Sequence, residues 1–205
     1  MNLKIFRDGI QKLIRTGPWS TYAPCIVGND SSTGFEVVHF INAANAQTVV
    51  SGQINIDELH VVPFIAPARG GLVSSIQCNF NTTGDQVRLG IYANVDNQLD
   101  LYPGKLLFES EPITIAVGEL PARCSLSLDP GHLYWGAIVV SATKTPFQCL
   151  QTYQCSHNLG IPSTETVNFA RSLVVAHTFG ALPATFPGGA AWSTLSPALK
   201  LRYAA

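Results

Sequence analysis

The chain consists largely of short runs rich in β-branched and aromatic residues, separated by Gly, Pro, Asn and Asp. This texture is typical of strands joined by turns. Alternation is clearest in residues 86–95, where Val87, Leu89 and Ile91 occupy one side and Arg88, Gly90 and Tyr92 occupy the other. A period of two residues predicts a strand with one face on a core.

Similar runs continue from residue 35 to the end of the chain, and turn signals separate them. They predict roughly eight to ten strands with no helical pattern between them, which favours an all-β domain. We expect an antiparallel, jelly-roll-like β-sandwich. The runs are residues 35–41, 54–67, 72–80, 86–95, 105–111, 113–117, 123–128, 133–141, 147–153, 171–179 and 198–203.

Only the first seventeen residues have a helical period. Apolar residues recur there at spacings of three and four, at Phe6, Ile10, Leu13 and Ile14, and Gly17-Pro18 predicts the helix end. A helix this short is marginal alone, so its apolar stripe must dock on its own core, a symmetry mate or a neighbouring protein. We therefore predict an N-terminal attachment segment of helix plus strands at 1–58 and the sandwich at 59–205.

The low fraction of charged residues limits the classes of function that the sequence allows. Charged residues make up 12% of the 205 residues, where about 25% is ordinary. The net charge of −1 predicts no attraction to nucleic acid, and no apolar run is long enough for a membrane-spanning helix. Low charge and the Pro- and Gly-rich stretch 180–197 indicate that other copies or other proteins cover part of the surface. The start of the chain lacks the pattern of a secretory signal, so we expect synthesis in the cytoplasm.

No motif for catalysis or for cofactor binding is present. The five histidines are isolated, and the five cysteines fit reduced, mostly buried thiols better than a disulfide framework. We predict no catalytic residue, cofactor or metal. Two alternatives stay open: calcium on a loop with Asp96, Asn97 and Asp100, and a glycoside hydrolase that uses carboxylates brought together by the fold.

Aromatic and apolar residues outside the expected core are the candidates for binding. Tyr134 and Trp135 lie within a predicted strand, so we expect their side chains to pack in the core or on a sheet face. We expect the aromatic residues in loop-like sequence to contact a protein or a glycan. We expect the apolar stripe of the helix to contact a protein. Together these candidates are Ile10, Leu13, Ile14, Trp19, Tyr22, Tyr102, Tyr153 and Trp192.

Residues 59–142 resemble a β-sandwich module of tailed-bacteriophage structural proteins. The runs that carry the resemblance are HVVPFIAP, RLGIY, LYPGKLLFES and LSLDPGHLYWGAIVVS, in this order. Residue types alone predict a type II turn at Pro103-Gly104 and a second turn at Asp129-Pro130-Gly131. The resemblance implies a non-catalytic virion protein that assembles as a homotrimer or a larger ring.

Several placements in a virion are compatible with this resemblance. Long fibres that carry the module often precede it with repetitive or collagen-like sequence, which this chain lacks. We therefore expect a tail-fibre or baseplate component that is synthesised in the host cytoplasm, binds other virion proteins and presents loops that contact the host. The alternatives are a capsid decoration protein, of cement or head-fibre type, and a carbohydrate-binding module for host surface glycans.

Overall fold

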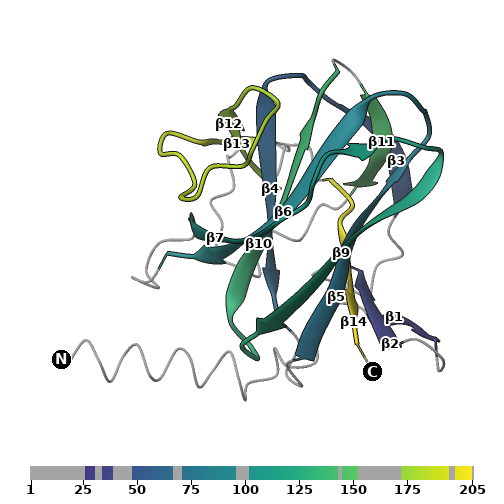
Figure 1. Cartoon of the computed structure of the whole chain (residues 1–205), viewed down its shortest axis with the longest axis vertical. Helices are drawn as coiled ribbons and strands as arrows, with labels where there is room; N and C mark the ends of the chain where they lie inside the picture. Colours follow the sequence, from purple (N-terminus) through teal and green to yellow (C-terminus); the bar gives the residue numbers. More distant parts are fainter. Residues whose placement is uncertain are drawn as a thin grey trace.

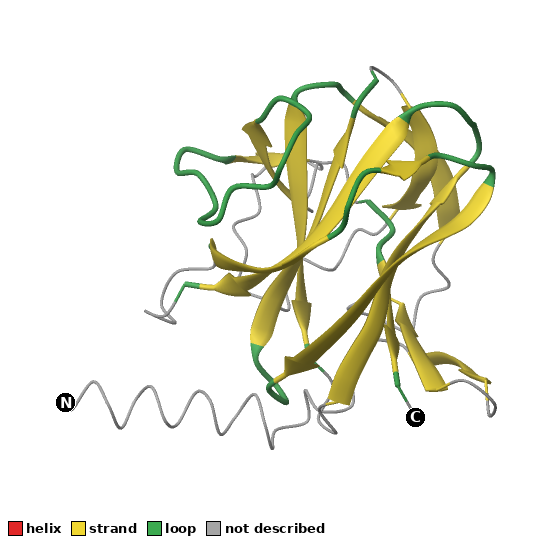
Figure 2. Cartoon of the chain, in the orientation of Figure 1, coloured by secondary structure: helices red, strands yellow, loops and turns green. Residues whose placement is uncertain are grey.

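The described residues form strands and loops only. In the computed structural model they are 26–30, 34–38, 48–66, 71–95, 102–142, 145–151, 172–193 and 197–204. All strand pairs among them are antiparallel, in two sheets (Figure 2). This confirms the predicted antiparallel, jelly-roll-like β-sandwich. The predicted N-terminal helix lies outside the described residues, and within them no helix is long and apolar enough to cross a membrane.

The first sheet is arranged around the ten-residue strand β5 (Figure 1). Strand β9 pairs along all of β5, whereas β14 pairs with residues 73–77 and β11 meets β5 at Phe80. Strand β2 pairs with β14, β1 with β2, and β3 with β11. The strands are β1 (Ile26–Asp30), β2 (Gly34–Val38), β3 (Thr48–Ile54), β5 (Gly71–Phe80), β9 (Gly118–Leu128), β11 (Thr145–Gln151) and β14 (Lys200–Tyr203).

The second sheet has β4 and β10 at its centre. Its order is β13-β12-β4-β10-β6-β7, and β8 pairs with the start of β6. Its strands are β4 (Glu58–Ile65), β6 (Gln86–Asn94), β7 (Pro103–Glu109), β8 (Ile113–Thr114), β10 (Leu133–Val140), β12 (Ser172–Ala176) and β13 (Ala191–Ser193).

The main core lies between the two sheets. Strands β5 and β14 contribute buried residues such as Ile76 and Tyr203, and β6 and β10 contribute others such as Leu89 and Ile138. Each of these four side chains is fully buried. Burying them contributes roughly 1.5–3 kcal/mol each relative to exposure, so this core is a principal source of stability.

The second sheet is buried on both faces. In β10, Tyr134 and Ile138 belong to the main core, whereas Trp135 and Val139 belong to a second cluster on the opposite face. A strand covered on both faces reads as a continuous apolar run, which accounts for the sequence LYWGAIVV. The packing predicted for Tyr134 and Trp135 is confirmed. Residues 177–190, the covering segment, contribute to the second cluster.

The run 54–67 is divided between the two sheets. Strand β3 ends at Ile54 in the first sheet, and β4 begins at Glu58 in the second. Between them Asp57 has a φ of 62°. Asp is one of the few residues other than Gly that adopts this left-handed conformation readily. The predicted run therefore covers β4 but only the last residue of β3, and the break between the two strands was not predicted.

Two further expectations are refined. Pro103 and Gly104 begin β7, and the φ of Gly104 is not positive, so the predicted type II turn is wrong there. The other predicted turn is present, with the N–H of His132 donating to the carbonyl of Asp129 at 3.2 Å. Strands β1 to β3 precede residue 59 and pair within the first sheet of the sandwich, while the proposed boundary at 59 stays a prediction.

Candidate functional site on the outer face of the second sheet

The covering segment is attached through backbone hydrogen bonds to strand β7. The N–H of Leu106 donates to the carbonyl of Ala184, and the N–H of Phe186 donates to the carbonyl of Gly104, each at 2.9 Å. The segment therefore leaves β12, reaches β7 on the other side of the second sheet at residues 184–186, and returns to β13, so it spans the sheet's outer face. Leu182 and Phe186 bury their side chains in this crossing.

Two tyrosine hydroxyls anchor the covering segment from the sheet. Tyr92 donates to the carbonyl of Pro183 at 3.0 Å, and Tyr102 donates to the carbonyl of Pro187 at 2.6 Å. Phe186 packs edge-on against both rings, with centroid distances of 5.5 and 5.6 Å. Burial, with the nearby charge of Glu109, raises the pKa of Tyr92, so its hydroxyl keeps its proton and acts as a donor.

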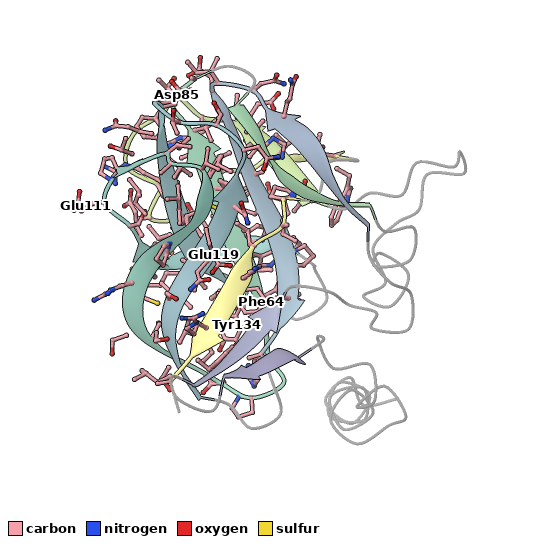
Figure 3. The ribbon with its side chains drawn as sticks, turned by 90° about the vertical axis from the view of Figure 1, so that its right-hand side faces the viewer. Phe64, Asp85, Glu111, Glu119 and Tyr134 are labelled. Atoms are coloured by element: carbon pink, nitrogen blue, oxygen red, sulfur yellow. The ribbon has the colours of Figure 1, made fainter. Side chains whose placement is uncertain are left out.

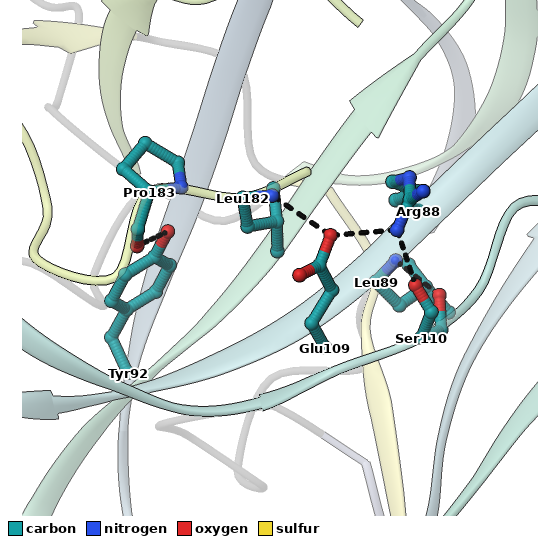
Figure 4. A network of polar contacts seen from close by, with 7 residues as sticks. All are labelled: Arg88, Leu89, Tyr92, Glu109, Ser110, Leu182 and Pro183. Atoms are coloured by element: carbon teal, nitrogen blue, oxygen red, sulfur yellow. Dashed lines mark hydrogen bonds and ion pairs between the residues drawn. The ribbon is translucent and has the colours of Figure 1, made fainter. Parts of the chain in front are cut away.

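An ion pair fixes the middle of the segment (Figure 4). Arg88 Nη1 lies 2.7 Å from Glu109 Oε1, and the same carboxylate oxygen accepts the N–H of Leu182 at 2.8 Å. Arg88 Nη1 also donates to the carbonyl of Ser110 at 3.0 Å. The side chains of Arg88 and Glu109 are 16% and 23% exposed, so water screens the pair only in part. Both charged side chains therefore bind backbone groups: Glu109 binds that of Leu182, and Arg88 binds that of Ser110.

Close packing beside this network requires a glycine. A Cβ added to Gly90 would lie 2.4 Å from Cδ1 of Leu182 and 3.0 Å from the carbonyl oxygen of Phe108. Gly90 therefore allows a close approach to the strand, and it is the covering segment that approaches.

Trp192 and Tyr102 are the two predicted binding residues that lie within the described part of the chain. Both are half-buried on this face and pack against the second cluster. Trp192 lies 6.3 Å from Trp135 between ring centroids, and Asn94 Oδ1 accepts hydrogen bonds from Trp135 Nε1 and from the N–H of Tyr102. The structure thus brings Tyr102 and Trp192 to one face and uses them in packing. Their predicted contact with a protein or a glycan stays a prediction.

The other predicted binding residues lie outside the described residues. They are Ile10, Leu13, Ile14, Trp19, Tyr22 and Tyr153. Two carboxylates of the described residues are held in ion pairs: Glu119 pairs with Lys200 at 2.6 Å, and Glu109 pairs with Arg88. The calcium candidates Asp96, Asn97 and Asp100 lie outside the described residues. Within the described ranges, no group of three or more His, Cys, Asp or Glu could hold a metal ion.

A second polar cluster lies where the chain crosses from β3 to β4. Glu58 accepts a hydrogen bond from Asn55 Nδ2, and its other oxygen lies 3.1 Å from His60 Nε2. Burial opposes ionisation of Glu58, but its bonds with Asn55 and His60 outweigh this and lower its pKa. Burial lowers the pKa of His60 more than Glu58 raises it. The N–H of His177 donates to the carbonyl of Asp57 at 2.8 Å, which ties this turn to the covering segment.

The two cysteines within the described residues are free thiols. Burial raises the pKa of Cys124 to about 11 and raises that of Cys78, which is fully buried, still further. Because the thiolate is the reactive form, neither group is prepared for nucleophilic chemistry at neutral pH.

Sequence reasoning missed the ion pair and the covering segment as a unit. Arg88 and Glu109 are twenty-one residues apart, and no short motif links them. The available signals were Arg88 on the side of β6 opposite the main core and Gly90 two residues later on the same side.

Comparisons with known proteins assign the chain to no family. No family model matches the chain, and no curated protein matches it. One similar solved structure is the clostridial cysteine protease Cwp84 after propeptide cleavage, with 11% sequence identity and a TM-score of 0.49. The match covers 85% of this chain and 41% of that chain.

Proposed function

We propose that the chain is a structural component of a bacteriophage virion, in a tail fibre or baseplate, where its sandwich carries loops that face outward. The observation that supports this most is the arrangement of the phage-like sequence runs. They become β4, β6, β7 and β10, which are consecutive neighbours in the second sheet. The runs therefore form one connected structural unit rather than scattered strands.

The polar groups of this unit have structural roles. The Arg88–Glu109 pair and the hydroxyls of Tyr92 and Tyr102 all hold the covering segment on the sheet. These polar groups thus support a scaffold, as the proposal requires. The charged fraction of 12% supports the same proposal, because a surface poor in charge favours association.

The test is the composition of purified particles. Mass spectrometry of gradient-purified virions is expected to find the chain at a fixed ratio to the other virion proteins, and the purified full chain is expected to form a homotrimer or larger ring. Absence from particles, together with a monomer at high concentration, would contradict the proposal. Immunogold labelling then separates the two placements, since label on the head alone supports capsid decoration and removes the tail assignment.

A carbohydrate-binding role is a second candidate, because Tyr102 and Trp192 share one partly exposed face. Aromatic rings can pack against sugars while keeping a polar edge in water. A glycan array with the full chain is the first test, and Trp192→Ala is expected to remove any signal. Trp192→Phe is the matched control, since it keeps an aromatic ring packed against Trp135. A blank array, or unchanged adsorption with Trp192→Ala, would contradict this role.

A further inference from the structure

The main core is incompletely sealed along one side of the sandwich. Among the residues whose side chains the structure describes, the apolar ones that pack against this core yet stay partly exposed belong to β7, β8 and β9. Strands β7 and β9 belong to different sheets and contact each other, so the two sheets meet on this side of the sandwich. We call this set the seam: Phe108, Ile113, Leu120, Cys124 and Leu126.

Exposed apolar residues extend the seam at its margins. Val117, in the connection from β8 to β9, is 68% exposed, and Leu107 in β7 is 36% exposed. Leu72, which pairs with Ser127 of β9, is 43% exposed. Single exposed apolar residues are ordinary, but several beside a partly open core mark an interaction surface.

The seam is acidic at one end. Glu111 lies between β7 and β8, and Glu119 is the second residue of β9. Asp85 lies beside the end of β8, because its carbonyl accepts the N–H of Ile115. Figure 3 labels the side chains of Asp85, Glu111 and Glu119. Asp85 is half-buried and both glutamates are exposed. Glu119 already pairs with Lys200, so Asp85 and Glu111 provide most of the negative charge here.

Addition of a further strand to β9 is disfavoured. Pro121 lies within this strand and has no N–H to donate, and Glu119 and Arg123 are exposed on either side of it. Proline and charged residues on an outer strand are the usual protection against pairing with another chain. A partner for the seam must therefore bring apolar side chains rather than a strand edge.

One segment of this chain has that chemistry. Its first seventeen residues carry the predicted apolar stripe, and they hold four basic side chains and one acidic side chain, a net charge of +3. The stripe requires an apolar partner, and the basic groups complement the acidic end of the seam. We propose that the seam binds the N-terminal segment, residues 1–17, of a neighbouring copy.

The proposed assembly of identical copies is the reason for assigning the segment to a neighbouring copy. A contact from one copy's N-terminus to the next copy's seam joins two different surfaces, which generates a ring when the rotation closes. The inference rests on the proposed function, because it specifies how the copies assemble.

The direct test is photo-cross-linking of the full-length assembly. A photoreactive amino acid replaces Val117, and copies labelled with ¹⁴N and ¹⁵N are mixed before illumination. The expected product joins position 117 of one isotope to residues 1–17 of the other, as read by mass spectrometry. Cross-links that form only within one copy, or only to other surfaces of the assembly, would overturn the proposal.

Matched variants give an independent measurement. Val117→Lys is expected to raise the concentration for half-association at least tenfold in analytical ultracentrifugation. The control is Ile56→Lys, which places the same charge at a turn residue that is 39% exposed and lies outside β7 to β9. Circular dichroism confirms that both variants keep the fold. If both variants form oligomers with equal affinity, the proposal for the seam is overturned and the proposed structural function is not. If the wild-type chain is a monomer, both are overturned.

Discussion

Substitution of Gly90 tests whether the covering segment is part of the folded core. In Gly90→Ala the new methyl group would lie 2.4 Å from Cδ1 of Leu182 and 3.0 Å from the backbone oxygen of Phe108. The leucine can move, but the β7 backbone is held by its pairing with β6. Overpacking of this kind costs about 1–3 kcal/mol. For a domain of this size that corresponds to a drop of roughly 2–12 °C in Tm.

The assay is urea unfolding of the full chain, followed by tryptophan fluorescence, because Trp135 and Trp192 lie in the same cluster. Gly188→Ala is the control, since a Cβ there would meet nothing within 4 Å. The double variant Gly90→Ala/Leu182→Ala separates the clash from other effects. It should lose less stability than the sum of the two single variants, because the atom that clashes is gone. Wild-type stability of Gly90→Ala, or simple additivity, would refute the reasoning.

Three further substitutions probe the ion pair, the buried histidine and the N-terminal stripe. Glu109→Gln should lower the free energy of unfolding, measured in urea, by about 1–2 kcal/mol, because it leaves the half-buried Arg88 without its counter-charge. Salt screens the pair, so a loss of stability that is no larger at low salt than at high salt would contradict this. The pKa of His60 is lower in the folded chain than in the unfolded chain, so the unfolded chain binds more protons at this histidine as the pH falls. The free energy of unfolding should therefore fall as the pH drops below about 6.5. His60→Gln should flatten this decline between pH 7 and 5. Parallel declines in both proteins would exclude His60 as the cause. Leu13→Lys should block incorporation into particles while leaving the Tm of the sandwich unchanged, and normal incorporation would contradict the attachment role.

The sequence predicted the parts of the fold that depend on local pattern. In residues 86–94 the alternation assigned both faces of β6 correctly, because one face lies on the main core. The continuous apolar run 133–141 correctly predicted the strand β10, and the structure shows that the run is apolar throughout because both faces of the strand are buried. The break at Asp57 was not predicted, because strand propensity is equally high on both sides of a change of sheet.

The candidate site was harder to predict because it depends on contacts between distant residues. Tyr102 and Trp192 were identified as loop aromatics, but their positions on one sheet face arise from the path of the covering segment. The contact of Glu109 with Leu182 spans seventy-three residues. A Pro- and Gly-rich stretch indicates a loop, and nothing in its composition specifies which face it crosses. The low charge was assigned to coverage by other proteins, while part of the apolar sequence in 180–192 is covered by the chain's own second sheet.

The central claim is that the chain is built permanently into a phage particle. Electron cryo-microscopy of intact particles tests this most directly, because one reconstruction shows both the location and the symmetry. The account predicts density for the two-sheet sandwich in threefold or ring-like groups on the tail or baseplate. Particles that lack this density at every site, with the chain monomeric in solution, would contradict the account.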